Sequence, residues 1–168
     1  IVASAMPRKL MWLPVPGQGE SADALLAEAR KALRCIEWQS ITVELMKKQI
    51  TGANAYSLSR PLGDHESIDF FLSHSWYDDG ELKYQKLQVL AESFYVRHNR
   101  YPSFWIDIVC IDQTRIHDGL KVISVNVMAC SQVLVLLGDT YPERLWCIWE
   151  LFVLFSFARN EDTFERVV

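Results

Sequence analysis

The sequence predicts an α/β fold in which a parallel sheet is covered by helices on both faces. Two observations predict it: short apolar segments alternate with helical segments along residues 67–168, and the apolar segments are continuous. Alternating strands and helices are typical of parallel sheets with helical crossover connections. Continuous apolar strands are typical of a sheet that is covered on both faces.

Residues 1–66 are expected to form an N-terminal region that precedes this domain. Prolines and glycines interrupt its first part, which is typical of an extended arm. Apolar residues then recur at helical spacing in two segments, and Ser21 can cap the first of them. The expected elements are an extended arm at 1–20, helices at 22–35 and 41–50, and a polar linker at 51–66.

The predicted domain, residues 67–168, begins with a short apolar run that ends in small polar residues, as a buried strand does. After it, Leu87, Leu90, Ala91 and Phe94 recur at helical spacing. The later segment 120–129 favours a helix, although its valines would also suit a strand. The expected strands are 68–73, 104–109 and 132–137, and the expected helices are 82–98, 120–129 and 143–158.

The composition bounds the function classes. The chain of 168 residues carries 17 Lys and Arg against 21 Asp and Glu, a net charge of −4, and has no basic tract, so no nucleic-acid partner is expected. No apolar stretch reaches the roughly 20 residues that span a bilayer, so no transmembrane segment is expected. The 4 cysteines form no CxxC pair, which favours reduced thiols and an intracellular protein over disulfides or zinc. The compartment itself stays unknown.

Polar and aromatic residues follow the predicted strands at one end. The carboxyl ends of parallel strands meet at the same edge of a sheet, and ligands of open α/β folds bind there. The segments at that edge are 73–76, 107–113 and 138–141. The sequence therefore predicts a ligand site at this edge, with Ser73, Trp76 and Asp107 among its residues.

Glu150 is the single charge within the apolar run from Leu145 to Ala158. A buried carboxylate without partners is costly, so Glu150 is expected to be paired, to lie at the edge of a pocket, or to have a shifted pKa. Trp146 lies about one helical turn before it, on the same face. Two interpretations stay open: a carboxylate beside an indole in a cleft, or a structural Glu150 bound to Arg144 or to a backbone donor.

The remaining motifs disfavour a hydrolase triad, a metal site and two classes of nucleotide-binding protein. Ser73 and His74 could suggest a nucleophile, but G-x-S-x-G is absent and no carboxylate is placed to orient the imidazole, so a hydrolase triad is not expected. Asp107 and Asp112 match no metal-binding spacing, so we expect no metal and assign these carboxylates to loop shape or to ligand hydroxyls. The sequence contains neither GxGxxG nor GxxxxGK[ST], which disfavours a Rossmann dehydrogenase and a P-loop protein.

Several segments resemble a known family. Asp69-Phe-Phe-Leu-Ser73 and Ser131-Gln-Val-Leu-Val-Leu-Leu137 are similar to the first and third strands of TIR (Toll/interleukin-1 receptor) domains. Leu145-Trp-Cys-Ile-Trp-Glu-Leu151 is similar to the Trp-Cys-Leu-x-Glu-Leu signature of plant TIR domains. Trp105-Ile-Asp-Ile-Val-Cys-Ile-Asp-Gln113 looks like the W-I-D-x-x-C-I-D-Q core of fungal heterokaryon-incompatibility (HET) domains. The resemblance covers residues 68–158.

The resemblance implies a flavodoxin-like α/β fold and an activity. Many TIR domains hydrolyse NAD⁺ in immune or cell-death signalling, and release nicotinamide without a further cofactor. The catalytic Glu of these domains matches Glu150, and the same analogy makes Trp146, Ser73, Trp76 and Asp107 substrate-binding residues. Other TIR domains are non-enzymatic interaction modules, which is the alternative. Self-association or other protein subunits are expected as partners.

The chain departs from the TIR pattern at three places, one of which is the loop after the second strand, where the usual Arg-Gly pair is absent. The loop after the first strand of the domain is His-Ser-Trp-Tyr-Asp-Asp rather than the plant Phe-Arg-Gly form. Arg166-Val167-Val168 is expected to begin a further strand, so the sheet is expected to be truncated at the C-terminus. Catalytic TIR domains need self-association to complete the pocket, so truncation is expected to lower activity.

Overall fold

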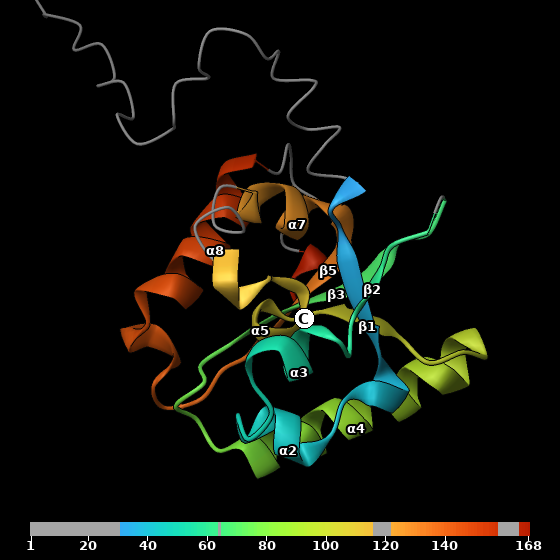
Figure 1. Ribbon diagram of the computed structural model, residues 1–168, viewed down its shortest axis with the longest axis horizontal. Coiled ribbons are helices and arrows are strands. Elements are labelled where there is room, and N and C mark those ends of the chain that lie inside the picture. Colours follow the sequence, from blue (N-terminus) through green and yellow to red (C-terminus); the bar gives the residue numbers. More distant parts are fainter. Residues whose placement is uncertain (1–30, 64, 116–121, 158–164) are drawn as a thin grey trace, which may run out of the picture.

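The computed structural model describes residues 31–63, 65–115, 122–157 and 165–168, and shows an α/β fold built on one five-stranded sheet (Figure 1). The strands are β1 (Arg34–Glu37), β2 (Arg60–Pro61), β3 (Ile68–His74), β4 (Ser103–Trp105) and β5 (Cys130–Leu136), in the order β2-β1-β4-β3-β5. β3 pairs in parallel with β4 and β5, whereas β1 pairs antiparallel with β4 and β2. The predicted α/β class is confirmed, but the sheet is mixed rather than all parallel.

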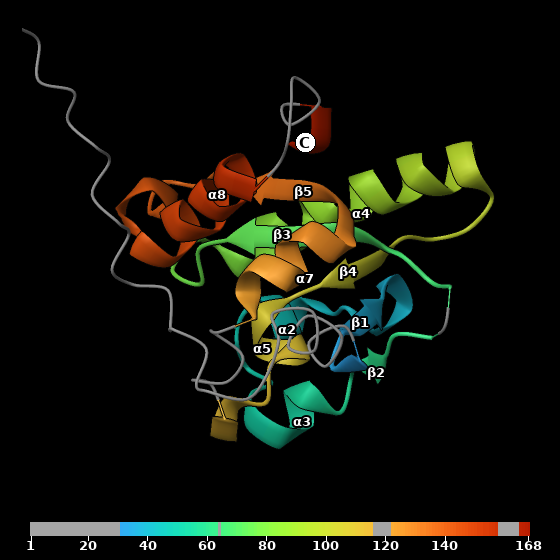
Figure 2. The same cartoon turned by 90° about the horizontal axis from the view of Figure 1, so that it is seen from above.

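Helices lie on both sides of the sheet. In Figure 1, α2 and α4 pack together below it, and α7 and α8 pack together above it. Figure 2 shows α3 and α5 on the side of the molecule where β1 and β2 lie. The helices and single turns are η1 (Trp38–Ser40), α2 (Val43–Met46), α3 (Gly52–Tyr56), α4 (Gly80–His98), α5 (Asp107–Cys110), η2 (Gln113–Arg115), α7 (Ile123–Ala129), η3 (Tyr141–Glu143) and α8 (Leu145–Phe157).

Helix α4 forms where its apolar spacing predicts it. The Asp79 carboxylate caps its first turn and accepts a hydrogen bond from the backbone N–H of Leu82 at 3.1 Å. Leu87, Ala91 and Phe94 recur every three or four residues and are buried against the core. The predicted helix at 82–98 is therefore confirmed, together with the face that it buries.

Gly80 sets how closely α4 approaches α2. A Cβ at this position would lie 2.6 Å from the backbone oxygen of Met46. Helix α2 is itself capped by Thr42, whose hydroxyl oxygen accepts a hydrogen bond from the N–H of Leu45 at 3.3 Å. The contact places the residues that follow α2 beside the loop after β3, where the candidate site lies.

The predicted strand at 104–109 is wrong in its second half. β4 ends at Trp105, and the chain then turns into α5. The carboxylate of Asp107 accepts a hydrogen bond from the N–H of its neighbour Ile108 at 2.6 Å. Such a local side-chain bond competes with strand pairing and favours a turn. The apolar side chains of Ile108 and Val109 are buried by a helical turn, which the continuous apolar run did not reveal.

The predictions for the N-terminal region are partly wrong. The end of the expected helix 22–35 is strand β1, because Cys35 and Ile36 are fully buried beside β4 and tertiary pairing overrides the helical spacing. The expected helix 41–50 is shortened to α2, and the expected linker holds α3 and β2. The arm 1–20 and residues 22–30 of the expected helix lie outside the described residues. Since β1 and β2 share a sheet with β3, residues on both sides of the expected boundary at 66 lie in one sheet.

The core lies between the sheet and its covering helices. Its centre is a stack of Phe71 on Trp105, with ring centroids 4.6 Å apart. Cys35, Cys110, Cys130 and Cys147 are free thiols buried in or beside this core. No helix in the described part of the chain is long and apolar enough to cross a membrane.

The C-terminal residues pair with β5 as the sequence predicts for the start of a strand. Val167 forms a parallel bridge with Val133. The N–H of Val168 donates to the oxygen of Val133 at 3.0 Å, and the oxygen of Val168 accepts from the N–H of Val135 at 2.9 Å. Residues 167–168 therefore lie beside β5 and run in the same direction as β3, β4 and β5.

Candidate ligand-binding site

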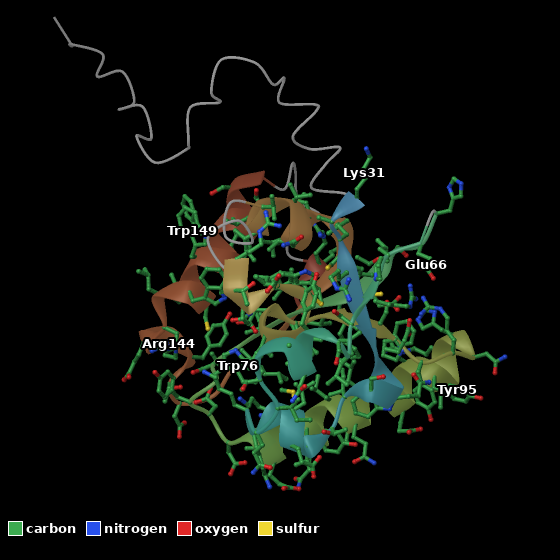
Figure 3. The ribbon with its side chains drawn as sticks, in the orientation of Figure 1. Lys31, Glu66, Trp76, Tyr95, Arg144 and Trp149 are labelled. Carbon is green, nitrogen blue, oxygen red and sulfur yellow. The ribbon has the colours of Figure 1, made fainter. Side chains whose placement is uncertain are left out.

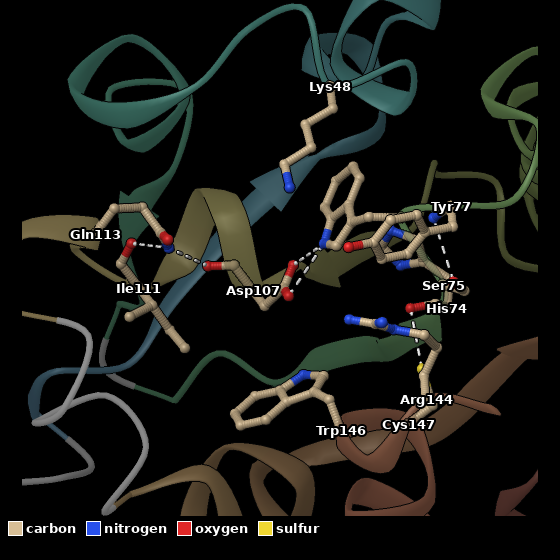
Figure 4. A pocket seen from close by; sticks show the side chains of 11 residues that line it. Lys48, His74, Ser75, Tyr77, Asp107, Ile111, Gln113, Arg144, Trp146 and Cys147 are labelled. Atoms are coloured by element: carbon tan, nitrogen blue, oxygen red, sulfur yellow. Dashed lines mark hydrogen bonds between the residues drawn. The ribbon is translucent and has the colours of Figure 1, made fainter. Parts of the chain in front are cut away.

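A cavity of about 280 Å³ lies at the carboxyl ends of β3 and β4 (Figure 4). β3 lies between β4 and β5, so the connections that leave these strands diverge around its carboxyl end. Such a switch point is where open α/β sheets bind ligands. The lining residues include Lys48, His74, Trp76, Asp107, Arg144 and Trp146.

Trp76 forms one wall of this cavity and is held in place by its neighbours. Its Nε1 donates hydrogen bonds to both carboxylate oxygens of Asp107, each at 3.1 Å. The ring of His74 meets the indole edge to face, with centroids 4.3 Å apart. The Nζ of Lys83 lies 5.3 Å from the indole centre, within cation–π range. The indole is therefore a fixed aromatic surface.

Asp107 presents a carboxylate to the cavity from the first position of α5 (Figure 4). Besides Trp76, the backbone N–H of Ile108 donates to it at 2.6 Å. Burial raises the pKa of the Asp107 carboxyl, and the hydrogen bonds from Trp76 and Ile108 and the charges of Lys48 and Lys83 oppose this rise. The result is an oriented carboxylate that can accept a proton or stabilise a positive charge.

Two cations, Lys48 and Arg144, line the cavity with Asp107. Lys48 reaches it from the end of α2, and its Nζ lies 6.0 Å from the centre of the Trp76 ring. The backbone of Lys48 is left-handed, with φ of 59°, which ends α2 and turns the chain. The guanidinium carbon of Arg144 lies 4.3 Å from the ring centre of Tyr77. Cations in these positions suit an anionic ligand group such as phosphate.

Two side chains of the wall have buried hydrogen-bonding atoms without a partner. These atoms are both ring nitrogens of His74 and the Nε1 of Trp146. Burial and the charge of Lys83 lower the pKa of His74 to about 3, so its ring is neutral and offers one donor and one acceptor. The nearby backbone of Leu72 opposes this shift but falls outside hydrogen-bond geometry. Nearly all buried polar atoms in proteins have a partner. The unused atoms thus suit a ligand that itself carries donors and acceptors.

Glu150 lies behind the cavity wall and does not line the cavity. Its side chain is 2% exposed and accepts a hydrogen bond from the Ser73 hydroxyl, which lies 2.7 Å from the Tyr141 hydroxyl. Because Ser73 donates its proton to Glu150, Tyr141 is the donor to Ser73. Burial raises the pKa of the Glu150 carboxyl well above its ordinary value, although the hydrogen bond from Ser73 opposes this. The nearby indole N–H of Trp146 opposes it too, but falls outside hydrogen-bond geometry.

The loop after β5 is joined to the loop after β3. The Asp78 carboxylate accepts hydrogen bonds from the N–H and the hydroxyl of Thr140, at 3.0 and 2.8 Å. The hydroxyls of Ser75 and Thr140 lie 2.7 Å apart. A Cβ on Gly138 would overlap the Asp78 carboxylate, so only glycine allows this approach. The junction fixes the start of α8, and with it Arg144 and Trp146, relative to Trp76.

The structure brings some of the predicted site residues together and separates others. Trp76, Asp107 and Trp146 line one cavity at the predicted edge. Ser73 and Glu150 contact each other but lie behind its wall. The interpretation in which Glu150 pairs with Arg144 is wrong, because the side-chain partner of Glu150 is Ser73 and Arg144 lies over Tyr77.

Both cations of this cavity, Lys48 and Arg144, lie outside the predicted site. Lys48 belongs to the region expected to precede the domain, and no local pattern shows that α2 carries it to the site. Arg144 lies just beyond the predicted edge segment 138–141, and the sequence indicates it only as a possible partner of Glu150. Across the described residues, no three His, Cys, Asp or Glu side chains lie close enough to hold a metal ion together.

The outward face of α8 is apolar. Leu145 is 83% exposed, and the rings of Trp149 (Figure 3) and Phe152 stack on each other at the surface with centroids 5.4 Å apart. Ile148 and Phe155 continue the same face and are each close to half exposed. Large apolar side chains that gather on one surface are typical of interaction sites.

Comparisons with known proteins do not identify a relative. No protein-family model matches the chain, and neither the curated proteins nor the solved structures contain a significant match to it.

Proposed function

We propose that the protein binds NAD⁺ in the cavity at the carboxyl ends of β3 and β4 and hydrolyses its nicotinamide–ribose bond, as TIR-type glycohydrolases do. The observation that carries the proposal is the cavity itself. It combines the indoles of Trp76 and Trp146, the carboxylate of Asp107, and the cations Lys48 and Arg144. Each of these groups matches a different part of the NAD⁺ molecule.

The aromatic walls suit the base, and the cations suit the diphosphate. The nicotinamide ring is flat and positively charged, and indole faces attract such rings. Its carboxamide carries the donor and the acceptors that the unpartnered atoms of His74 and Trp146 require. The diphosphate is an anion, for which Lys48 and Arg144 are the cations at the cavity.

A carboxylate near the ribose would promote bond cleavage. Loss of nicotinamide develops positive charge on the ribose, and a nearby carboxylate stabilises it. Nicotinamide leaves as a neutral molecule, so no general acid is needed. Glu150 is the candidate that the TIR resemblance implies, and Asp107 is the candidate that faces the cavity.

The fold is consistent with the proposed TIR-like, flavodoxin-like arrangement. Its parallel strands occur in the spatial order β4-β3-β5, with the first of them along the chain in the centre. Flavodoxin-like sheets begin with this order. The segment similar to HET domains begins at the last residue of β4 and includes α5, and the segment similar to plant TIR domains forms the first half of α8. Both segments contribute a residue to the cavity, Asp107 and Trp146.

The test is nicotinamide release from NAD⁺ at high protein concentration, followed by chromatography. Trp146→Ala and Trp149→Ala are a matched pair, since both remove an indole from α8 but only Trp146 lines the cavity. We expect Trp146→Ala to raise KM roughly tenfold and Trp149→Ala to leave it unchanged. Absence of nicotinamide release by the folded wild-type protein would refute the proposal.

The exposed apolar face of α8 favours a second function, that of a non-enzymatic interaction module. In that case the buried Glu150 is structural and the outward face of α8 contacts a second copy or another subunit. The same two variants test it, with sedimentation velocity as the measurement. An interaction module predicts that Trp149→Ala weakens association while neither the wild type nor a variant consumes NAD⁺.

A further inference from the structure

We infer that the carboxylate that meets the reacting ribose in this protein is Asp107, and that Glu150 is a structural residue behind the wall. The inference rests on the proposed function, and it assigns the chemistry differently from the TIR resemblance. It is carried by the positions of the two side chains relative to the cavity.

The carboxyl groups of Asp107 and Glu150 differ in whether a ligand in the cavity can reach them. A carboxylate stabilises a developing ribosyl cation only when it lies against the anomeric carbon, within contact distance. Asp107 lines the cavity, and Figure 4 shows its carboxylate between Lys48 and Trp146. Glu150 is 2% exposed and is not part of the lining. A substrate in the cavity therefore contacts Asp107 and does not reach Glu150.

The two carboxyl groups also differ in the hydrogen bonds and the charges around them. The indole of Trp76 and the N–H of Ile108 donate to Asp107 and orient its two oxygens. Burial raises the pKa of Asp107, and the positive charges of Lys48 and Lys83 oppose this rise and favour its ionised form. Within the described residues, the hydrogen bond donated to Glu150 comes from the neutral Ser73, and no cation pairs with it. Burial raises the pKa of Glu150 well above its ordinary value with no cation to oppose it, which favours the neutral form of this carboxyl.

The cations at the cavity complete the arrangement. With the diphosphate bound, Lys48 and Arg144 pair with the phosphates, and the charge of Lys83 still favours the ionised form of Asp107. The charge of Asp107 is then available for the ribose. Lys48 is contributed by the N-terminal region, outside the segment that resembles TIR domains, so this region takes part in the site.

The reaction balances with water as the co-reactant. The bond between the ribose and the nicotinamide nitrogen breaks, and its electron pair leaves with the nicotinamide, which becomes neutral. The Asp107 carboxylate stabilises the ribosyl cation until water attacks the anomeric carbon. The attacking water gives one proton to Asp107, which releases it to solvent, and the products are ADP-ribose, nicotinamide and one proton.

Asp107→Asn and Glu150→Gln test the assignment, because each replaces a carboxyl by an amide of the same shape. We expect Asp107→Asn to lower kcat roughly a hundredfold and to leave the dissociation constant for ADP-ribose, measured by calorimetry, nearly unchanged. The loss should exceed that of Glu150→Gln at least tenfold. A larger loss in Glu150→Gln than in Asp107→Asn would overturn the inference and leave the glycohydrolase function standing. A wild-type protein that binds ADP-ribose but releases no nicotinamide would instead refute the proposed function.

Trp76→Phe provides a second measurement that does not depend on removing a carboxyl. Phenylalanine keeps a ring in the wall but removes the N–H that donates to Asp107. Loss of this donor raises the pKa of Asp107, so the acidic limb of the kcat/KM pH profile should move to higher pH. An acidic limb that does not move in Trp76→Phe would contradict a role for the Asp107 carboxylate in the reaction.

Discussion

The two ends of strand β3 hold cavities that differ in whether their polar groups are paired. At the amino end, Asp69 accepts hydrogen bonds from both terminal nitrogens of Arg100, each at 2.7 Å. A cavity of about 460 Å³ lies beside them, and there Arg60 forms ion pairs with Glu37 and Glu66. The charged groups at this end are paired with one another.

The carboxyl end has the smaller cavity, about 280 Å³, but leaves more of its hydrogen-bonding capacity unused. Both nitrogens of His74, the Nε1 of Trp146 and one oxygen of Asp78 are buried there without a partner. An unpartnered buried atom costs stability, which a protein tolerates where a ligand supplies the missing partner. The candidate site at the carboxyl end of β3 therefore differs from the amino end by its unpartnered hydrogen-bonding atoms, and not by a larger cavity.

The same contrast appears in the pKa of two buried acids. Burial alone would raise the pKa of Asp69, but the hydrogen bonds from Arg100 and from the N–H of Ser103 outweigh it, so this pKa is lowered. Burial raises the pKa of Glu150, and no cation opposes it among the described residues. The two acids should therefore affect stability with opposite dependence on pH.

The largest expected effect is at the amino end. Asp69→Ala removes the buried partner of Arg100 and leaves the N–H of Ser103 without its acceptor, so we expect the free energy of unfolding in urea to fall by about 3 kcal/mol. Arg60→Ala is the matched control, because its ion pairs with Glu37 and Glu66 are exposed; it should cost less than about 1 kcal/mol. Equal losses in the two variants would show that the Asp69 network is not the stabilising one.

The next effect tests the junction that positions the candidate site. Gly138→Ala places a Cβ against the Asp78 carboxylate, and we expect it to lower the free energy of unfolding by about 2 kcal/mol. In the Asp78→Ala background the overlapping carboxylate is gone, so the same substitution should cost clearly less. A double-mutant cycle in urea measures this coupling. Additive losses would mean that the close approach of Gly138 and Asp78 is not what requires glycine.

The smallest expected effect is the pH dependence caused by Glu150. Its folded-state pKa is raised above the unfolded value of about 4.3, so the wild type loses stability as pH rises from there toward the folded-state pKa. Glu150→Gln keeps an acceptor for Ser73 and removes the titrating group. We expect the variant to be more stable than the wild type by on the order of 1 kcal/mol at pH 7 and equally stable near pH 4.

Thermal unfolding of both proteins between pH 4 and pH 8 measures this difference. Asp69 should have the opposite effect on the pH dependence of stability, because its pKa is lowered in the folded state. It stabilises the folded protein above about pH 3.9, and this stabilisation is lost as pH falls through the folded-state pKa. A Glu150→Gln advantage that stays constant with pH would show that the Glu150 carboxyl has the same pKa in the folded and the unfolded protein.

The sequence predicts the elements of the molecule whose patterns are long and uniform. The strand at Ile68–His74 and the helix at Gly80–His98 follow from a continuous apolar run and a repeated helical spacing. β1 was missed because its four residues become a strand only by pairing with β4, which lies far away in the sequence. β2 was missed because it holds Pro61, which is tolerated only at an edge of the sheet such as this one.

The candidate site, too, could be predicted from the sequence only in part. The edge that would carry the ligand could be predicted, because the ends of parallel strands converge, and Trp76, Asp107 and Trp146 do meet there. The depth of each side chain could not be predicted. Trp146 and Glu150 share one face of α8, yet only Trp146 lines the cavity, while Glu150 lies one turn deeper against Ser73.

The four buried cysteines can report local unfolding of the elements that contain them. Cys35 lies in β1, Cys110 in α5, Cys130 at the start of β5 and Cys147 in α8. Burial raises the pKa of each thiol, so the reactive thiolate is scarce while the fold is closed. Alkylation of each cysteine, followed by mass spectrometry, therefore records how often its own element exposes it to solvent. The native chain thus carries a separate kinetic reporter in each of four elements, without any introduced label.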